Sequence, residues 1–184
     1  MKFRVTHDGV ARTYAALRHT AWHLLQMAKT HNEGSLLTLQ AVAVFNAFTF
    51  EAYLNHVGAE EIEFWNEIDR ISYVKKLRII QSQLKMAIDN GKPPFQVIQE
   101  VFDLRNILAD GRTQTINESY ETDTEPVHRM TWNILEWEKL TPDKVELYSK
   151  SVDEAIMLIN AARATPDEMI WDKGIRGRTV EVIK

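Results

Sequence analysis

The residues best suited to chemistry lie close together in the segment 101–111, which contains Arg105, Asn106, Asp110 and Gly111. An arginine can stabilise negative charge on phosphoryl oxygens, because its planar guanidinium offers several hydrogen-bond donors. An aspartate has an ordinary pKa of about 3.9, so Asp110 is expected to be ionised at pH 7, where it is a weak acid and repels phosphate. Arg105 therefore favours anion binding, whereas Asp110 opposes acid–base chemistry.

This segment is the last part of a helix that the sequence predicts from Pro94 to about Asp110. Proline suits the first turn of a helix, and a glycine in the left-handed conformation commonly follows its end, so Pro94 and Gly111 mark the two boundaries. Apolar residues recur between them at three- and four-residue steps, the pattern of a helix with one buried face. The candidate residues are therefore expected near the C-terminal end of a packed helix.

Most of the remaining chain also has helical periodicity. The helix expected from Leu36 to about Val57 is apolar on most sides, so it is expected to be buried, inside a bundle or partly in an oligomer interface. The other expected helices are about Asp8–His31, Ile71–Ile88 and Pro142–Arg163, with a short piece at Glu60–Glu67 and a break in the last helix near Ser149–Ser151. Five main helices with little strand imply an all-α antiparallel bundle.

Three segments lie outside this helical pattern. Residues 117–125 are polar and are predicted to form a surface loop, while residues 129–137 fit either a helix or a short strand. Residues 179–183 alternate in the manner of a strand. We therefore expect one helical domain at residues 1–165 and a short irregular or strand-like tail at residues 166–184.

Composition narrows the class of protein. The chain has 184 residues, 45% hydrophobic and 26% charged, which suits one globular domain, and its net charge of −4 gives no general tendency toward nucleic acid or membranes. It has no cysteine, which excludes disulfides, thiolate metal sites and a cysteine nucleophile.

Polar Thr6, His7 and Asp8 leave no signal-peptide apolar region near the start. Gln40 and Glu51 interrupt the most apolar stretch, so a soluble cytoplasmic protein is expected.

The Arg105 segment resembles the signature of the HEPN family. In that family a late helix carries Arg, usually Asn or another polar residue, about three further residues, His and often Gly. Arg105, Asn106 and Gly111 match this pattern, and Asp110 stands where the family has its histidine.

A second resemblance supports the first. The residues Phe50–Asn55 are similar to the central helix of HEPN-type proteins, and a helix bearing Lys75 and Lys76 follows, as it does in that family. Together the two similarities cover roughly residues 36 to 111, and the expected last helix fits the same bundle.

The resemblance implies a metal-independent ribonuclease built across a symmetric dimer, in which the Arg and His of each protomer meet near the two-fold axis. RNA cleavage by its own 2′-hydroxyl needs one proton removed from that hydroxyl and another delivered to the leaving oxygen, and histidine can do either near neutral pH. With Asp110 in place of the histidine, the ribonuclease motif is degenerate. Arg105, Asn106 and Asp110 are then expected to line a binding cleft, with Asp110 paired to Arg105 or Arg112.

The leading hypothesis is a HEPN-like homodimer, joined through the central and Arg105-bearing helices, that binds RNA, a nucleotide or an antitoxin-like protein and uses no cofactor or metal. Families of this kind often act in toxin–antitoxin pairs, phage defence or stress response. Two alternatives stay open. One is an active endoribonuclease in which Arg105 acts with His19, His23, His56 or His128, and the other is a purely structural dimeric scaffold.

Two pairs of residues that include histidine have the spacing of metal ligands. His19 and His23, four residues apart, could share a metal ion, yet no glutamate follows His19 in the zinc-protease pattern. Glu125 and His128 have helical spacing, but Pro126 separates them. A surface or packed role is favoured for both pairs.

Other polar and aromatic side chains also fit structural roles. Glu51 and Asn46 are expected to hydrogen-bond within the core or a dimer interface. Trp132 and Trp137 could stack on bases, though packing is favoured. The local basic cluster is in the tail and could touch phosphate, though a solvated terminus is favoured; it consists of Lys173, Arg176, Arg178 and Lys184, against one acid, Glu181.

Overall fold

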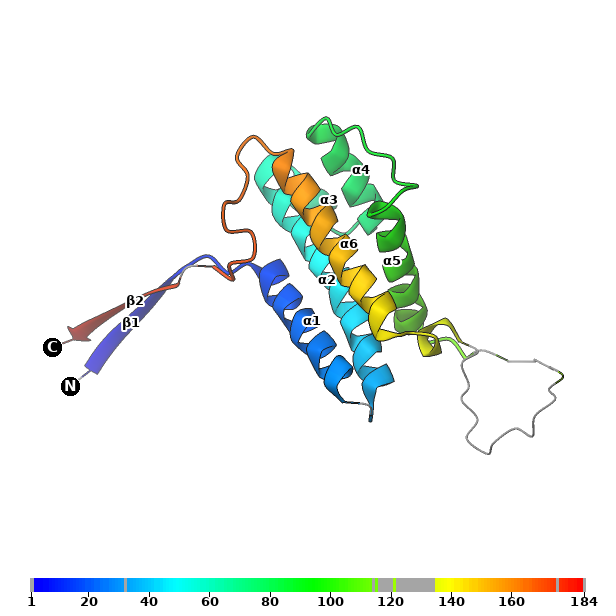
Figure 1. Ribbon diagram of the computed structural model, residues 1–184. Helices are drawn as coiled ribbons and strands as arrows, with labels where there is room; N and C mark the ends of the chain where they lie inside the picture. Colours follow the sequence, from blue (N-terminus) through cyan, green and yellow to red (C-terminus); the bar gives the residue numbers. More distant parts are fainter. Residues whose placement is uncertain are drawn as a thin grey trace.

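The computed structural model describes residues 2–31, 33–113, 115, 121, 135–174 and 176–183, and it confirms the expected all-α bundle (Figure 1). The five substantial helices are α1 (Thr13–Thr30), α2 (Ser35–Glu61), α4 (Tyr73–Gln83), α5 (Phe95–Asp110) and α6 (Pro142–Ala161). The short elements are α3 (Trp65–Ile68), the 3₁₀ turn η1 (Glu136–Glu138), and the strands β1 (Lys2–Gly9) and β2 (Arg176–Ile183).

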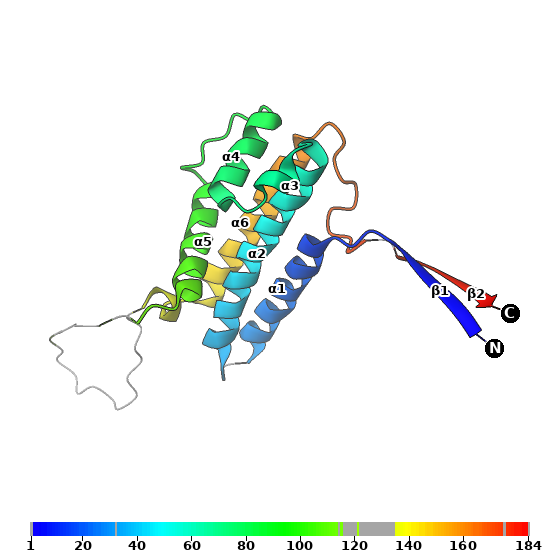
Figure 2. The same cartoon turned by 180° about the vertical axis from the view of Figure 1, so that it is seen from behind.

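Helix α2 is the central element, because α1, α4, α5 and α6 all pack against it (Figure 2). This explains why its sequence is apolar on most sides: Val42, Ala47 and Phe50 face different neighbours and are all fully buried. Among the described residues α2 is the one helix long and apolar enough to cross a membrane by length and composition. The central helix of a bundle passes the same test, and 39% of its apolar window is buried here.

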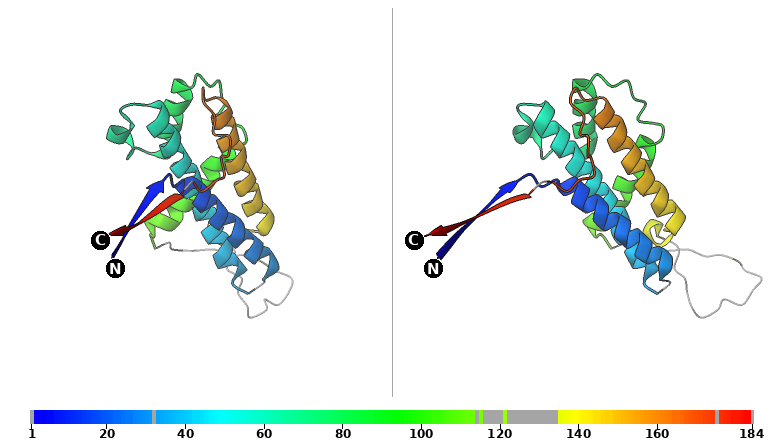
Figure 3. Two further views of the ribbon diagram at one scale, coloured as in Figure 1. Left: turned by 90° about the vertical axis from the view of Figure 1, so that its left-hand side faces the viewer. Right: turned by 60° about the vertical axis from the view of Figure 1, so that its left-hand side comes forward.

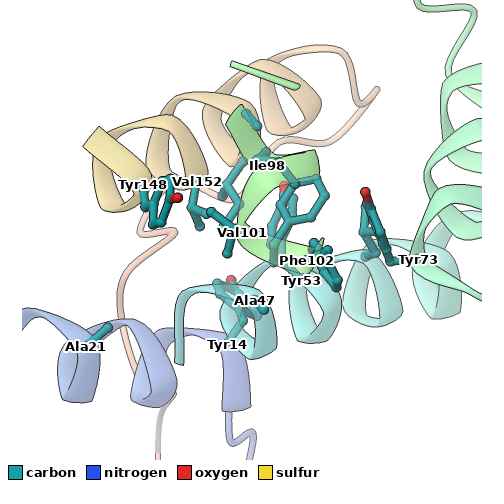
Figure 4. Packing of buried hydrophobic residues seen from close by; sticks show 14 of the residues in the cluster. Tyr14, Ala21, Ala47, Tyr53, Tyr73, Ile98, Val101, Phe102, Tyr148 and Val152 are labelled. Carbon is teal, nitrogen blue, oxygen red and sulfur yellow. The ribbon is translucent and has the colours of Figure 1, made fainter. Parts of the chain in front are cut away.

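Aromatic side chains fix α4 and α5 on α2 (Figure 4). The rings of Tyr73 and Phe102 stack with centroids 3.5 Å apart, and Phe102 meets Phe50 edge-on at 6.3 Å. Such pairs contribute about 0.5–1.5 kcal/mol each beyond the area that they bury. Because Arg105 follows Phe102 by one helical turn, this packing also sets the position of the Arg105 side chain.

Two glycines have structural roles: one ends a helix, and the other allows two helices to pack closely. Gly111 has φ of +56° and ends α5, as predicted for a left-handed C-terminal cap. Gly58, inside α2, lies against the Trp65 ring so closely that a Cβ would come within 2.2 Å of it. A side chain at Gly58 would therefore push α3 away from α2.

The first expected helix starts later than predicted. Asp8 belongs to β1, which pairs antiparallel with β2 in a register that places Phe3 opposite Val182 and Val5 opposite Val180. Periodicity alone did not reveal β1, because its partner lies at the other end of the sequence. The strand-like character of residues 179–183 is confirmed, as part of β2.

Three other predicted boundaries are corrected. Helix α6 runs without a break through Ser149–Ser151, because the Ser149 hydroxyl donates to the Val145 carbonyl at 3.2 Å within the helix. Helix α4 ends at Gln83 rather than Ile88. Helix α2 continues to Glu61, so only Trp65–Ile68 of the predicted short piece is a separate helix. Most of residues 117–125 and 129–134 lie outside the described residues.

Candidate functional site

Arg105 belongs to an ion-pair cluster between α2, α4 and α5 that is centred on Glu51. Its Nη2 donates to Glu51 Oε2 at 3.2 Å, and Lys76 Nζ donates to the other oxygen, Glu51 Oε1, at 3.0 Å. The three residues Glu51, Lys76 and Arg105 are called the Arg105 cluster below. The sequence pointed to Arg105 and to Glu51, and the structure brings them into contact.

The charges of the Arg105 cluster are unequally buried and incompletely paired. The Lys76 side chain is 3% exposed, so it needs the carboxylate of Glu51, whereas the Arg105 side chain is 25% exposed. One carboxylate therefore serves two cations. Arg105 Nε is buried without a hydrogen-bond partner, and the guanidinium carbon lies 5.2 Å from the Phe102 ring centroid. Arg105 keeps donor capacity that the described residues do not use.

A chain of polar side chains extends this surface along α5. The Tyr73 hydroxyl donates to Gln99 Oε1 at 2.5 Å, and Gln99 Nε2 donates to Asp103 Oδ1 at 2.7 Å. Burial raises the pKa of Tyr73 to about 12, with a further increase from Asp103 and an opposing decrease from Arg105. Tyr73 is therefore neutral at physiological pH and acts as a hydrogen-bond donor.

Asn106 and Asp110 are both exposed, and they lie four residues apart on one side of α5. Arg105 and Asp110 are five residues apart, about 140° around the helix, so their side chains leave it in different directions. The expected pairing of Asp110 with Arg105 or Arg112 is not formed: Arg105 binds Glu51, and Asp110 has no ion pair within the described part of the chain. The structure groups Asn106 with Asp110, and Arg105 with Glu51.

Three of the histidines that the structure describes, His19, His23 and His56, contact other parts of the bundle. His56, on α2, stacks near Tyr14 of α1 at 5.0 Å, and its Nε2 lies 3.0 Å from Asp167 Oδ2. His19 and His23 face each other on α1, with Nε2 atoms 2.8 Å apart. These three therefore lie on the α1 side of α2, whereas the Arg105 cluster faces α4 and α5. His128 lies outside the described residues.

A second ion-pair cluster was missed by the sequence analysis. Arg163, just after α6, donates from Nε to Glu61 Oε1 at 2.9 Å and from Nη1 to Asp167 Oδ2 at 2.9 Å, and its Nη2 binds Glu60. His56 joins through the same Asp167 carboxylate. These five residues are called the Arg163 cluster below. Spacings of four residues, His56 to Glu60 and Arg163 to Asp167, were the available sequence signal.

The Arg163 cluster is closed, because every charge in it meets an opposite one. Burial lowers the pKa of Arg163, but the Glu61 hydrogen bond and the Glu60 and Asp167 charges outweigh that effect and raise the pKa above its usual range. Burial would raise the pKa of Asp167, yet the His56 hydrogen bond and the Arg163 charge hold it below its usual range. The cluster ties the segment after α6 to the end of α2, which brings β2 beside β1.

His56, Glu60 and Asp167 also have the spacing of metal ligands. One ligand atom from each lies within 4.8 Å of the other two. The Arg163 guanidinium, however, donates to the carboxylates of both Glu60 and Asp167. A cation is thus already supplied by the protein, and a metal ion would have to compete with it.

A cavity of about 400 Å³ lies beside the Arg163 cluster, at the start of α1. Arg12 Nε, the Tyr14 hydroxyl and Asn55 Oδ1 are buried there or nearby without hydrogen-bond partners. The Tyr53 hydroxyl lies beside Arg163, also without a hydrogen bond of normal geometry. Burial raises the pKa of Tyr14 to about 12. The region offers donors and acceptors together, as suits a small neutral molecule such as water.

The remaining candidate residues either pack within the bundle or lie outside the described residues. Asn46 Nδ2 donates to the Ser149 hydroxyl at 2.9 Å inside the core, as expected for a buried amide. Trp137 is partly buried against the core. Trp132, Glu125 and the side chains of Arg176, Arg178 and Lys184 are outside the described residues.

Comparison of the chain with protein families, with curated proteins and with solved structures finds no match. The HEPN resemblance therefore depends on the residues of this chain alone, and the function is argued from the site.

Proposed function

We propose that this protein is a HEPN-like homodimer that binds single-stranded RNA through the Arg105 cluster without cleaving it. The observation that carries the proposal is the incomplete pairing of Arg105: it shares one carboxylate with the buried Lys76, and its side chain, 25% exposed, makes one hydrogen bond to the described residues. Within the Arg105 cluster two cations share one carboxylate. A phosphate oxygen is the ligand that such an arginine binds best.

The described part of this surface lacks the histidine that cleavage needs. Asp110 stands where the HEPN motif has the histidine that can take and give a proton near neutral pH. His19, His23 and His56 lie on the α1 side of α2, and the other described histidines, His7 and His31, lie in β1 and at the end of α1. Tyr73 is close by, but its raised pKa of about 12 makes it a poor base at neutral pH. These features favour binding over catalysis.

A second copy of the chain fits the open side of α2. The residues Leu37, Ala41, Val44 and Phe48 follow steps of four, three and four residues, the spacing of a helix-packing seam, and the next step leads to Glu51. Leu37 is 69% exposed and Phe48 43% exposed. In Figure 2 this part of α2 lies in front, between α1 and α5. Pairing two such faces would bring both Arg105 clusters toward one two-fold axis.

The test uses labelled single-stranded and hairpin RNA of about twenty nucleotides in excess EDTA. The wild type is compared with Arg105→Ala and Asp110→His. Arg18→Ala is the matched control, because Arg18 is also bound to a carboxylate, that of Asp153, and is 18% exposed, but lies on the α1–α6 side.

We expect the wild type to leave RNA intact and to retain it with an affinity that falls as salt rises. Arg105→Ala should weaken binding about fivefold to tenfold and make the salt dependence shallower, by about 0.7 in the log–log slope for each phosphate that is no longer bound. Arg18→Ala should change the affinity less than about twofold. Asp110→His should gain cleavage that needs Arg105. Cleavage by the wild type, abolished in Arg105→Ala, would establish the endoribonuclease alternative. If the wild type neither retains nor cleaves RNA, the scaffold alternative remains.

A further inference from the structure

The β1–β2 ribbon projects away from the helices in both views of Figure 3. All eight residues of β1 are exposed. A single two-stranded ribbon is marginally stable in water, and three or more strands with an apolar face are needed for independent stability. Each strand of the ribbon therefore has one edge paired with the other strand and one free edge, with which a further strand can pair.

The two faces of the ribbon differ in chemistry. Phe3 opposes Val182 and Val5 opposes Val180, so these four apolar side chains share one face, with exposures between 43% and 58%. The other face is polar and carries the Arg4–Glu181 ion pair at 3.9 Å. Such alternation is typical of an antiparallel sheet with one packed face and one solvated face.

Two charges on the polar face of β1 have no ion-pair partner among the described side chains. Lys2 and Asp8 stand at opposite ends of the strand, on the same face because their spacing is even. Neither makes an ion pair with another side chain that the structure describes, whereas Arg4, between them, already binds Glu181. The edge strand therefore presents a cation at one end and an anion at the other.

We propose that β1 pairs antiparallel with β1 of a second copy of this chain, centred on Val5, to give a four-stranded sheet of order β2-β1-β1-β2. Centring on Val5 places Lys2 opposite the partner subunit's Asp8, and Asp8 opposite the partner subunit's Lys2. Opposite charges directly across an antiparallel pair stabilise it. This self-complementarity identifies the partner as a second copy of the chain, because a two-fold axis through Val5 pairs both charges at once.

Other registers of β1 lack this match. A shift by one residue would place apolar side chains opposite polar ones. Centring on Arg4 would set two arginines opposite each other, which is destabilising. Centring on Thr6 would pair Asp8 with the partner's Arg4, which already binds Glu181 in its own subunit, and would leave Lys2 unpaired.

Pairing through β2 is also less favourable. Centring on Val180 brings no opposite charges together, and centring on Glu181 opposes two glutamates. With β1 at the centre, by contrast, the apolar face gains a continuous row of valines: Val180 and Val5, followed by the partner's Val5 and the partner's Val180.

The chain has no cysteine, so single cysteine variants report this contact cleanly. In the proposed register the Cα atoms of the two Val5 residues lie about 4.5–5.5 Å apart, within the range that a disulfide spans. The two Val180 residues are three strand spacings apart, about 14 Å, and cannot be joined. Val5→Cys and Val180→Cys are thus a matched pair: the same substitution, on the same face, at similar exposure (43% and 50%).

The two variants are oxidised with diamide at low micromolar concentration, and the disulfide-linked dimer is measured on non-reducing gels, with circular dichroism as the check on folding. We expect Val5→Cys to cross-link at least about tenfold faster than Val180→Cys. In the Val5→Cys background, Lys2→Asp or Asp8→Lys alone should slow cross-linking roughly tenfold, because two attractive pairs become repulsive. The double variant Lys2→Asp/Asp8→Lys should restore the rate.

Equal cross-linking at the two positions, or failure of the double charge variant to recover, would overturn the proposed register. The experiment measures the cross-linking rate and not the mass of the protein in solution, so a dimer formed through α2 does not give a false positive result. The ribbon contains no residue of the Arg105 cluster. Failure of this test and failure of RNA binding are therefore distinguishable.

Discussion

Arg105 and Arg163 bind carboxylates of the central helix α2 from different sides, and they differ in how completely their charge is paired. Arg163 meets the carboxylates of Glu60, Glu61 and Asp167, and its side chain is 3% exposed. Arg105 meets the single carboxylate of Glu51, which Lys76 also uses, and its side chain is 25% exposed. The first arginine is enclosed by acids, and the second shares one acid with another base.

This difference separates a structural ion-pair network from a candidate binding surface. Removing one member of a buried network leaves the others desolvated without compensation, so such networks resist change. A partly exposed arginine with incomplete pairing can take up an anion without breaking the fold, since Glu51 keeps Lys76 as its partner. The pairing state of an arginine therefore indicates its role better than its place in a motif.

The largest effect is expected from removing Arg163. Arg163→Ala leaves Glu61 and Asp167 partly buried without their main cation, so we expect a loss of about 3–5 kcal/mol in the free energy of unfolding. Arg105→Ala, the matched change in the other cluster, should cost about 1 kcal/mol. Urea unfolding followed by circular dichroism measures both. Equal losses would contradict the distinction between the fully paired Arg163 cluster and the incompletely paired Arg105 cluster.

The Arg163 cluster should also make stability depend on pH on the acid side. The pKa of Asp167 is held below its usual range, so its contribution is fully present above the unfolded pKa of about 3.9 and is lost as pH falls below that value. Asp167→Asn should therefore be about 1–3 kcal/mol less stable than wild type at pH 7. The two proteins should converge in urea unfolding as pH falls below about 4 and through the lowered folded pKa of Asp167. A difference that did not narrow as pH fell would assign the stability to something other than the charge of Asp167.

On the alkaline side, one tyrosine beside each cluster should respond alike. Tyr14 and Tyr73 both have a pKa raised to about 12, mainly by burial. Their folded pKa lies above the unfolded value of about 10, so they stabilise the fold below pH 10 and lose that contribution as pH rises toward 12. Absorbance titration near 295 nm should show that Tyr14→Phe and Tyr73→Phe each remove one late-titrating group. Loss of an early-titrating group instead would show that the tyrosine is accessible.

The smallest effect is expected at Asn106. Its side chain is exposed, so Asn106→Ala should change the free energy of unfolding by less than about 0.5 kcal/mol. In the RNA retention assay it should weaken binding less than Arg105→Ala does. A larger loss of binding at Asn106 would move the binding surface from the Arg105 cluster to the side of α5 that carries Asn106 and Asp110.

Local sequence signals predicted most of the helical fold. The proline pair and Gly111 bounded α5 to within a residue, because cap and turn residues act on their immediate neighbours. The all-round apolar character of α2 predicted its central place, since such a helix must be covered on several sides. The predicted break in α6 was wrong: the helix is continuous, and the Ser149 hydroxyl is satisfied within the helix and the core.

The candidate site could be predicted only in part. Arg105, Asn106 and Asp110 stood out as a group, but helix geometry separates them: Arg105 faces Glu51, while Asn106 and Asp110 are exposed elsewhere on α5. The Arg163 cluster was not predicted, because its members come from α2 and from the segment after α6, which are far apart in the sequence. No local pattern brings such residues together.

The sequence by itself determined the helices, their caps, the buried central helix and the absence of cysteine chemistry, since each depends on residue type and short-range spacing. Only the tertiary structure decided which charges meet. It paired Glu51 with two cations, enclosed Arg163 among three acids, and placed β1 against β2. Ion pairs and strand pairs depend on distances of a few ångströms between residues far apart in the chain, and those distances exist only once the helices have packed.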